Sequence, residues 1–86
     1  MAKPYEIRVT RQAQKDLATL TPNLKRKLKE ILTETLARNP WCGKRLLGDL
    51  AGSFSLRLTY KDRIVYSVDE EKHIIYVERA RTHYGE

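Results

Sequence analysis

The closing residues of the chain combine groups that bind phosphate, move a proton and stack on a base. These groups are Arg81, His83 and Tyr84, within the run Arg79–Glu86. Arginine holds phosphate oxygens with a planar charged fork, and histidine exchanges protons near neutral pH. Tyrosine stacks on an unstacked base or donates a hydrogen bond. Acid–base chemistry on RNA requires this set, because RNA carries its own nucleophile in the 2′-hydroxyl.

Two more arginines lie on segments whose alternation predicts β-strands, Ser53–Tyr60 and Arg63–Val68. Successive side chains of a strand point to opposite faces of the sheet. Packing of the apolar set inward therefore sends Arg57 and Arg63 outward, side by side on one open face. The residues expected inward are Phe54, Leu56, Leu58 and Tyr60 on the first strand, and Ile64, Tyr66 and Val68 on the second.

A third strand is expected from His73 to about Thr82, after a turn at Asp69–Lys72. Both of its faces carry apolar residues, so the alternation is less decisive here. A twist or bulge near the strand end would move the last side chains to the other face. Strict alternation puts Ile75, Val77, Arg79, Arg81 and His83 on one face, and Ile74, Tyr76 and Glu78 on the other, with Glu78 expected to point inward.

The first half of the chain predicts one strand and two helices. Tyr5–Thr10 alternates, and Thr10 is a plausible N-cap for a helix that begins at Arg11. Thr21 caps a second helix, with Pro22 at its first position and its end near Arg38. The apolar helix faces comprise Ala13, Leu17 and Leu20, then Leu24, Leu28, Ile31, Leu32, Thr35 and Leu36.

These elements make one α+β domain over residues 1–86, in the order strand–helix–helix–strand–strand–strand. Trp41–Gly52 is expected to be a loop, and Lys61–Asp62 a tight hairpin turn. The three last strands form an antiparallel meander, and the helical hairpin is the candidate cover for its apolar face. We interpret His73, Trp41 and Cys42 as structural residues.

Composition limits the function classes. The net charge of +6 favours a polyanionic partner, although a merely soluble surface or an acidic protein partner also fits it. One cysteine excludes an internal disulfide, and with two histidines we expect no metal site and no cofactor. No apolar run is long enough for a membrane helix, and no secretory signal is evident, so we expect a cytoplasmic protein.

Several segments in order along nearly the whole chain resemble one family. They include Asn39-Pro40, Ser55–Leu58, Arg63–Asp69 and Thr82–Tyr84. In these segments the chain resembles the RelE/ParE superfamily of small toxins from toxin–antitoxin pairs. The resemblance implies a microbial ribonuclease-like, RelE-like fold. RelE-like members cleave mRNA in the ribosomal A site, whereas ParE-like members inhibit DNA gyrase.

The resemblance also implies roles for individual residues. Arg57 and Arg63 match basic residues of the nuclease branch, and the closing His83-Tyr84 matches its YoeB-like members. With Arg81, the arginines would hold the scissile phosphate. His83 would protonate the leaving 5′-oxygen, and Tyr84 would stack on or orient a base. The glutamate general base of the YoeB-like branch has no match. Lys44 is the candidate in its place, and Glu78 is a weaker one because it is expected to point inward.

The sequence therefore predicts a toxin that acts as a metal-independent endoribonuclease (an mRNA interferase) on the ribosome. Its partners would be a cognate antitoxin, in a hetero-oligomer, together with the ribosome and mRNA. Two alternatives stay open: a ParE-like gyrase inhibitor without catalysis, and an inactive RNA-binding module.

Overall fold

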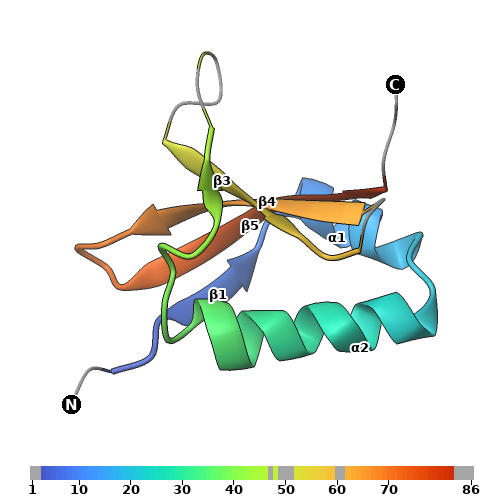
Figure 1. Cartoon of the computed structure of the whole chain (residues 1–86), viewed down its shortest axis with the longest axis horizontal. Coiled ribbons are helices and arrows are strands. Elements are labelled where there is room, and N and C mark those ends of the chain that lie inside the picture. Colours follow the sequence, from blue (N-terminus) through green and yellow to red (C-terminus); the bar gives the residue numbers. More distant parts are fainter. Residues whose placement is uncertain (1–2, 47, 49–51, 60–61, 83–86) are drawn as a thin grey trace.

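The computed structural model describes residues 3–46, 48, 52–59 and 62–82. Within this part of the chain, two helices and a π-helical turn accompany a sheet of five strands in the order β1-β5-β4-β3-β2 (Figure 1). The elements are β1 (Glu6–Val9), α1 (Arg11–Ala18), α2 (Pro22–Glu30), η1 (Ile31–Leu36), β2 (Lys44–Arg45), β3 (Ser53–Arg57), β4 (Asp62–Asp69) and β5 (Ile74–Thr82). The predicted α+β class and the order of the main elements are confirmed.

Both helices begin where the sequence places their caps. The hydroxyl of Thr10 accepts the N–H of Ala13, and the hydroxyl of Thr21 accepts the N–H of Leu24. Each cap satisfies one of the N–H groups that a helix start leaves without a partner. Pro22 occupies the first turn of α2, as predicted.

The second helix differs from its prediction after Glu30. There the α-helix gives way to the wider turn η1, in which the N–H of Ala37 donates to the carbonyl of Leu32 over 3.0 Å. The Thr33 hydroxyl also donates to the carbonyl of Lys29, which an α-helical N–H would otherwise use. The wider turn shifts the helical phase. Thr35 is therefore exposed, and its predicted inward position is wrong.

One cluster of buried side chains joins the helices to one face of the sheet. The strands contribute the inward set predicted from alternation, except Tyr60, which lies outside the described residues. Since apolar burial contributes about 25 cal/mol per Å², this shared core holds the helices on the sheet. Its buried members are Ala13, Leu20, Leu28, Leu32, Leu36, Phe54, Leu58, Ile64, Tyr66, Ile75, Val77 and Ala80.

The antiparallel meander β3–β4–β5 is confirmed, although β3 ends at Arg57, before the predicted end at Tyr60. Two further corrections concern Asp62 and the loop before β3. Asp62 does not lie in a tight turn: it is buried in β4, where its carbonyl accepts the N–H groups of Leu58 and Thr59. The segment predicted as a loop contains the short strand β2, which pairs antiparallel with β3. A two-residue strand is too short to show alternation, and its existence depends on pairing with distant residues.

The first strand closes the other side of the sheet. β1 pairs parallel with β5, from Glu6 opposite Ile74 to Val9 opposite Val77. Beyond Val77, β5 extends past the end of β1, and its neighbour on that edge is α1. The backbone N–H of Thr10 donates to the carbonyl of Val77, and its hydroxyl donates to the carbonyl of Glu78.

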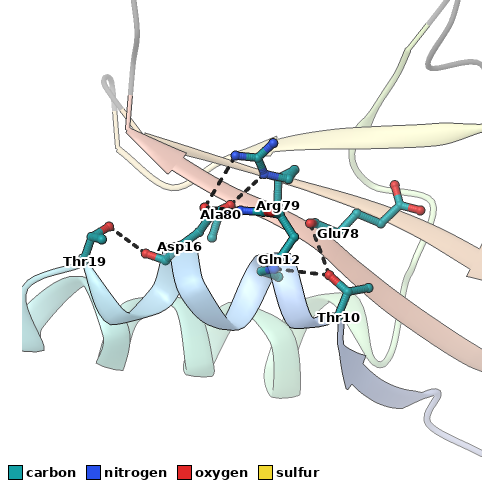
Figure 2. A network of polar contacts seen from close by, with 8 residues as sticks. Thr10, Gln12, Asp16, Thr19, Glu78, Arg79 and Ala80 are labelled. Carbon is teal, nitrogen blue, oxygen red and sulfur yellow. Dashed lines mark hydrogen bonds and ion pairs between the residues drawn. The ribbon is translucent and has the colours of Figure 1, made fainter.

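Asp16 of α1 binds this last part of β5 (Figure 2). Its carboxylate accepts hydrogen bonds from Arg79 Nε at 2.8 Å and from the Ala80 N–H at 3.1 Å. Burial by itself raises the pKa of Asp16, but the hydrogen bonds from Arg79 and Ala80 and the charge of Arg79 outweigh it and lower the pKa. The Asp16 side chain is 14% exposed and that of Arg79 is 38% exposed, so solvent screens the pair in part.

We expect Asp16→Asn to lower the free energy of unfolding by about 1–3 kcal/mol at pH 7, because the amide removes the charge and turns a donor toward Arg79. A carboxyl group with a lowered pKa stabilises the fold above its unfolded pKa of about 3.9, and that stabilisation is lost as the pH falls below it. Urea unfolding of both proteins should therefore show a difference at pH 7 that shrinks at pH 3.

Glu34→Gln is the matched control, since Glu34 pairs with Arg38 on the helical surface at 3.7 Å with both side chains exposed. Exposed pairs of this kind contribute little, so we expect a loss below about 0.5 kcal/mol. An Asp16→Asn loss no larger than that of the control would contradict the assigned role.

Candidate phosphate-binding site

The two strand-borne arginines lie opposite one another, as predicted. Arg57 of β3 pairs with Arg63 of β4 in the antiparallel register. Leu56 and Ile64 form the preceding pair and point to the helix side, so alternation sends both arginines to the open face. Both arginines are exposed. Two permanent positive charges therefore lie side by side on the sheet.

Lys44 joins these arginines from β2. It pairs with Ser55, two positions before Arg57 on the same face of β3. A hollow of about 300 Å³ lies among them, lined by Lys44, Ser55, Leu56, Arg57 and Arg63. The sequence predicted Lys44 as a site residue but not the strand that brings it to the arginines.

No carboxylate neutralises this hollow within the described part of the chain. The ion pairs found there join Arg8 to Glu6, Arg38 to Glu34 and Arg79 to Asp16. Like charges repel, so the hollow favours an anion that bridges them. Guanidinium groups bind phosphate oxygens in pairs, and an ammonium group adds a point charge.

Arg81 is opposite Arg63 in the register of β4 and β5. The three predicted arginine positions thus form one row across β3, β4 and β5, although the side chain of Arg81 lies outside the description. His83 and Tyr84 also lie outside the described residues. Their roles stay predictions.

The last strand departs from strict alternation. A bulge in β5 sets Tyr66 opposite Val77 and Val65 opposite Arg79, so Glu78 is the additional residue. Val77 and Ala80 are both buried on the helix side. Arg79, opposite Val65, therefore lies on the open face and does not share a face with Ile75 and Val77. The expected sharing of one face by Ile75, Val77, Arg79 and Arg81 is therefore wrong.

Glu78 does not point inward, contrary to the prediction. Its two carboxylate oxygens accept hydrogen bonds from Ser53 Oγ and Ser67 Oγ, each at 3.0 Å. These serines are paired on the open face of β3 and β4. The carboxylate thus ties the three meander strands together. The Ser55–Val65 pair separates it from the arginine pair, so it is not part of the cationic hollow.

Tyr66 supports the site from the opposite face. Its ring is fully buried beside Phe54, with ring centres 5.5 Å apart. Its hydroxyl donates to the carbonyl of Pro40 at 2.8 Å and accepts the N–H of Gly43 at 3.0 Å. Burial raises the pKa of Tyr66 to about 12, although the bond from Gly43 acts in the opposite direction. The sequence identified Tyr66 only as a core residue, because the residues near it in the sequence do not reveal the hydrogen-bond partners of its hydroxyl.

Of the three residues interpreted as structural, His73 and Trp41 make ring contacts, whereas Cys42 is exposed and its role stays a prediction. His73 stacks on Tyr5 with ring centres 3.7 Å apart, which joins the β4–β5 turn to the chain before β1. Trp41 contacts the edge of Phe54. No group of three or more potential metal-binding side chains occurs among residues 3–46, 48, 52–59 and 62–82. No helix within those ranges is long and apolar enough to cross a membrane.

A family model described as the ParE-like toxin of type II bacterial toxin–antitoxin systems matches residues 7–85. The chain belongs to this family. Among curated proteins, the ParE-like toxin is similar to toxin RelG of Mycobacterium tuberculosis, with 37% identity over 79 residues, or 90% of this chain and 88% of RelG.

Solved structures confirm the fold of this ParE-like toxin. A chain of the toxin–antitoxin complex RelBE2 from Mycobacterium tuberculosis aligns with a TM-score of 0.85 at 33% identity, covering 93% of this chain and 92% of the other. The YoeB/ParE toxin from Agrobacterium tumefaciens aligns with a TM-score of 0.80 at 26% identity, covering 92% and 99%. The resemblance to the RelE/ParE superfamily is thus confirmed.

We expect Arg63→Gln to weaken binding of a short single-stranded RNA and to make the logarithm of the affinity less dependent on the logarithm of salt concentration. The slope should fall by about 0.7, the value for one lost phosphate contact on a single strand. Fluorescence anisotropy over a salt series measures both quantities. Arg26→Gln, on the exposed side of α2, removes the same charge elsewhere. Equal effects of the two variants would show that net charge alone attracts RNA.

Proposed function

We propose that this toxin is a ribosome-dependent endoribonuclease that cleaves mRNA in the A site and so inhibits translation. The observation that carries the proposal is the cationic hollow, in which Lys44, Arg57 and Arg63 from three strands line one space on an open sheet face. Similarity to toxin RelG and to a chain of the RelBE2 complex supports the same branch of the superfamily.

In the proposed reaction, the arginines clamp the scissile phosphate. Arg57 and Arg63 contact its non-bridging oxygens, with Arg81 completing the row. The 2′-oxygen of the preceding ribose attacks phosphorus, and the bond from phosphorus to the 5′-oxygen breaks. Negative charge builds on the phosphoryl oxygens in the transition state, where fixed cations stabilise it most. The products would carry a 2′,3′-cyclic phosphate and a 5′-hydroxyl.

Proton transfer needs an acid and a base. His83 would donate the proton to the leaving 5′-oxygen, and Tyr84 would stack on or orient a neighbouring base. Lys44 is the candidate for removing the 2′-hydroxyl proton, since it lines the hollow with both arginines. Glu78 is a poorer candidate, because both of its oxygens are engaged by serine hydroxyls outside the hollow.

The protein partner would be a cognate antitoxin, bound in a hetero-oligomer in the cytoplasm. The RelBE2 structure is a complex of a toxin with its antitoxin, and the family is defined by such pairs. An antitoxin with acidic segments would complement the net charge of +6.

We expect the purified toxin to cut mRNA at codon-spaced positions in a translating extract. His83→Gln should slow cleavage by about 100-fold or more through loss of the general acid, and Arg63→Gln by about 100-fold through loss of charge stabilisation. Mapping of mRNA 5′ ends over time locates the cuts and measures the cleavage rate of each protein. Chemical analysis of the fragments identifies the cyclic phosphate.

The gyrase alternative is tested in parallel with a DNA supercoiling assay. Absence of cuts together with inhibition of supercoiling would overturn the proposal and support a ParE-like inhibitor. Absence of both, with RNA binding retained, would support an inactive RNA-binding module. Arg26→Gln should cleave as the unmodified toxin does, because α2 lies outside the proposed site.

A further inference from the structure

Lys44 lies on the least supported strand of the sheet. β2 contains only Lys44 and Arg45, and it lies at the edge of the sheet with β3 as its single neighbour. Its ladder consists of the pairs Lys44–Ser55 and Arg45–Phe54, and the N–H of Leu46 adds a bond to the carbonyl of Ser53. So short an edge strand does not fix a lysine by backbone pairing alone.

The start of β2 is held from the core instead. The Tyr66 hydroxyl bonds both the carbonyl of Pro40 and the N–H of Gly43, the residue directly before Lys44. A tyrosine hydroxyl can donate one hydrogen bond and also accept one. Tyr66 uses its donor and its acceptor on the same loop. The ring cannot shift to follow the loop, because it is fully buried and stacked beside Phe54.

Gly43 is fitted to this contact. A Cβ atom at position 43 would collide with the Tyr66 hydroxyl and would lie 3.0 Å from the carbonyl oxygen of Ser55. Glycine therefore lets the loop approach both the tyrosine and β3 closely. The raised pKa of Tyr66, about 12, keeps the hydroxyl protonated and able to donate throughout the physiological range.

We propose that Tyr66 is a positioning residue for the candidate site: through Pro40 and Gly43, its buried hydroxyl fixes the backbone from which Lys44 reaches the Arg57–Arg63 pair. This role rests on the proposed function, because it concerns RNA held and cleaved in the cationic hollow. Tyr66 itself faces the helices and does not contact the substrate.

The test is a double-mutant cycle that combines Tyr66→Phe with Lys44→Met. The phenylalanine keeps the ring and its packing but removes the hydroxyl, and methionine keeps most of the lysine side chain without its charge. RNA affinity over a salt series and the rate of mRNA cleavage are measured for all four proteins. Tyr5→Phe is the matched control, because Tyr5 directly precedes β1, at the sheet edge opposite to β2, and stacks on His73.

We expect Tyr66→Phe to weaken RNA binding and cleavage about tenfold. It should also lower the salt slope by about 0.7, as Lys44→Met does, because each removes the same phosphate contact. In the Lys44→Met background, Tyr66→Phe should change binding less than about twofold, since the lysine it positions is gone. Tyr5→Phe should leave all three measurements unchanged.

Equal effects of Tyr66→Phe in both backgrounds, or an unchanged salt slope, would overturn the proposal and assign the hydroxyl to general stability. Circular dichroism and thermal unfolding establish that Tyr66→Phe is folded. If it is not, Gly43→Ala replaces it in the cycle, because the added methyl group displaces the same contact from the loop side.

Failure of the proposed function appears in the unmodified protein. If the unmodified toxin binds RNA but does not cleave it, the proposed nuclease function is wrong. The RNA affinities of the double-mutant cycle still test the coupling of Tyr66 to Lys44. Absence of RNA binding in the unmodified toxin overturns both.

Discussion

The register of β4 against β3 decides where the arginine pair of the site, Arg57 and Arg63, lies. Arg63 and Tyr66 point to opposite faces of β4. Tyr66 is buried in the core against the helices, and Arg63 is exposed on the open face. A slip of one residue would turn the buried Tyr66 outward and push Arg63 into the core. An unpaired guanidinium in an apolar core costs several kcal/mol, so the packing of the helix side also specifies the charge pattern of the open side.

The residues that support the site and the residues proposed to bind the substrate lie on different sides of the sheet. The cations lie on the open face, whereas the groups that fix their backbones come from the other side. Tyr66 reaches from the core to the loop before Lys44, and Asp16 reaches from α1 to the strand that carries Arg81. The open face is thereby left to bind an anion at Arg57 and Arg63, which form no ion pair within the described part of the chain.

Local patterns in the sequence were sufficient for much of this arrangement. Alternation placed Arg57 beside Arg63, since each strand is long enough to show its period and one face is clearly apolar. Cap residues located both helix starts, because capping involves neighbours three positions apart. These features depend on short-range chemistry that a single segment contains.

The features that could not be predicted depend on residues distant in the sequence. β2 exists through its pairing with β3 and through the hydroxyl of Tyr66, and neither is visible in Lys44-Arg45 itself. The bulge at Glu78 reconciles the pairing of β5 with β1 and with β4, and it is stabilised by serines on two other strands. The alternation of β5 alone was therefore ambiguous.

The contact of Asp16 with β5 has a consequence for association between molecules. An uncovered strand edge presents N–H groups on which a strand of a second molecule can add, and repeated addition leads to aggregation. Here the N–H of Ala80 is already bonded to a carboxylate that belongs to the same chain. The Asp16 carboxylate on α1 thus blocks edge-to-edge growth at the segment where β5 has run beyond β1, and it does so without lengthening the sheet.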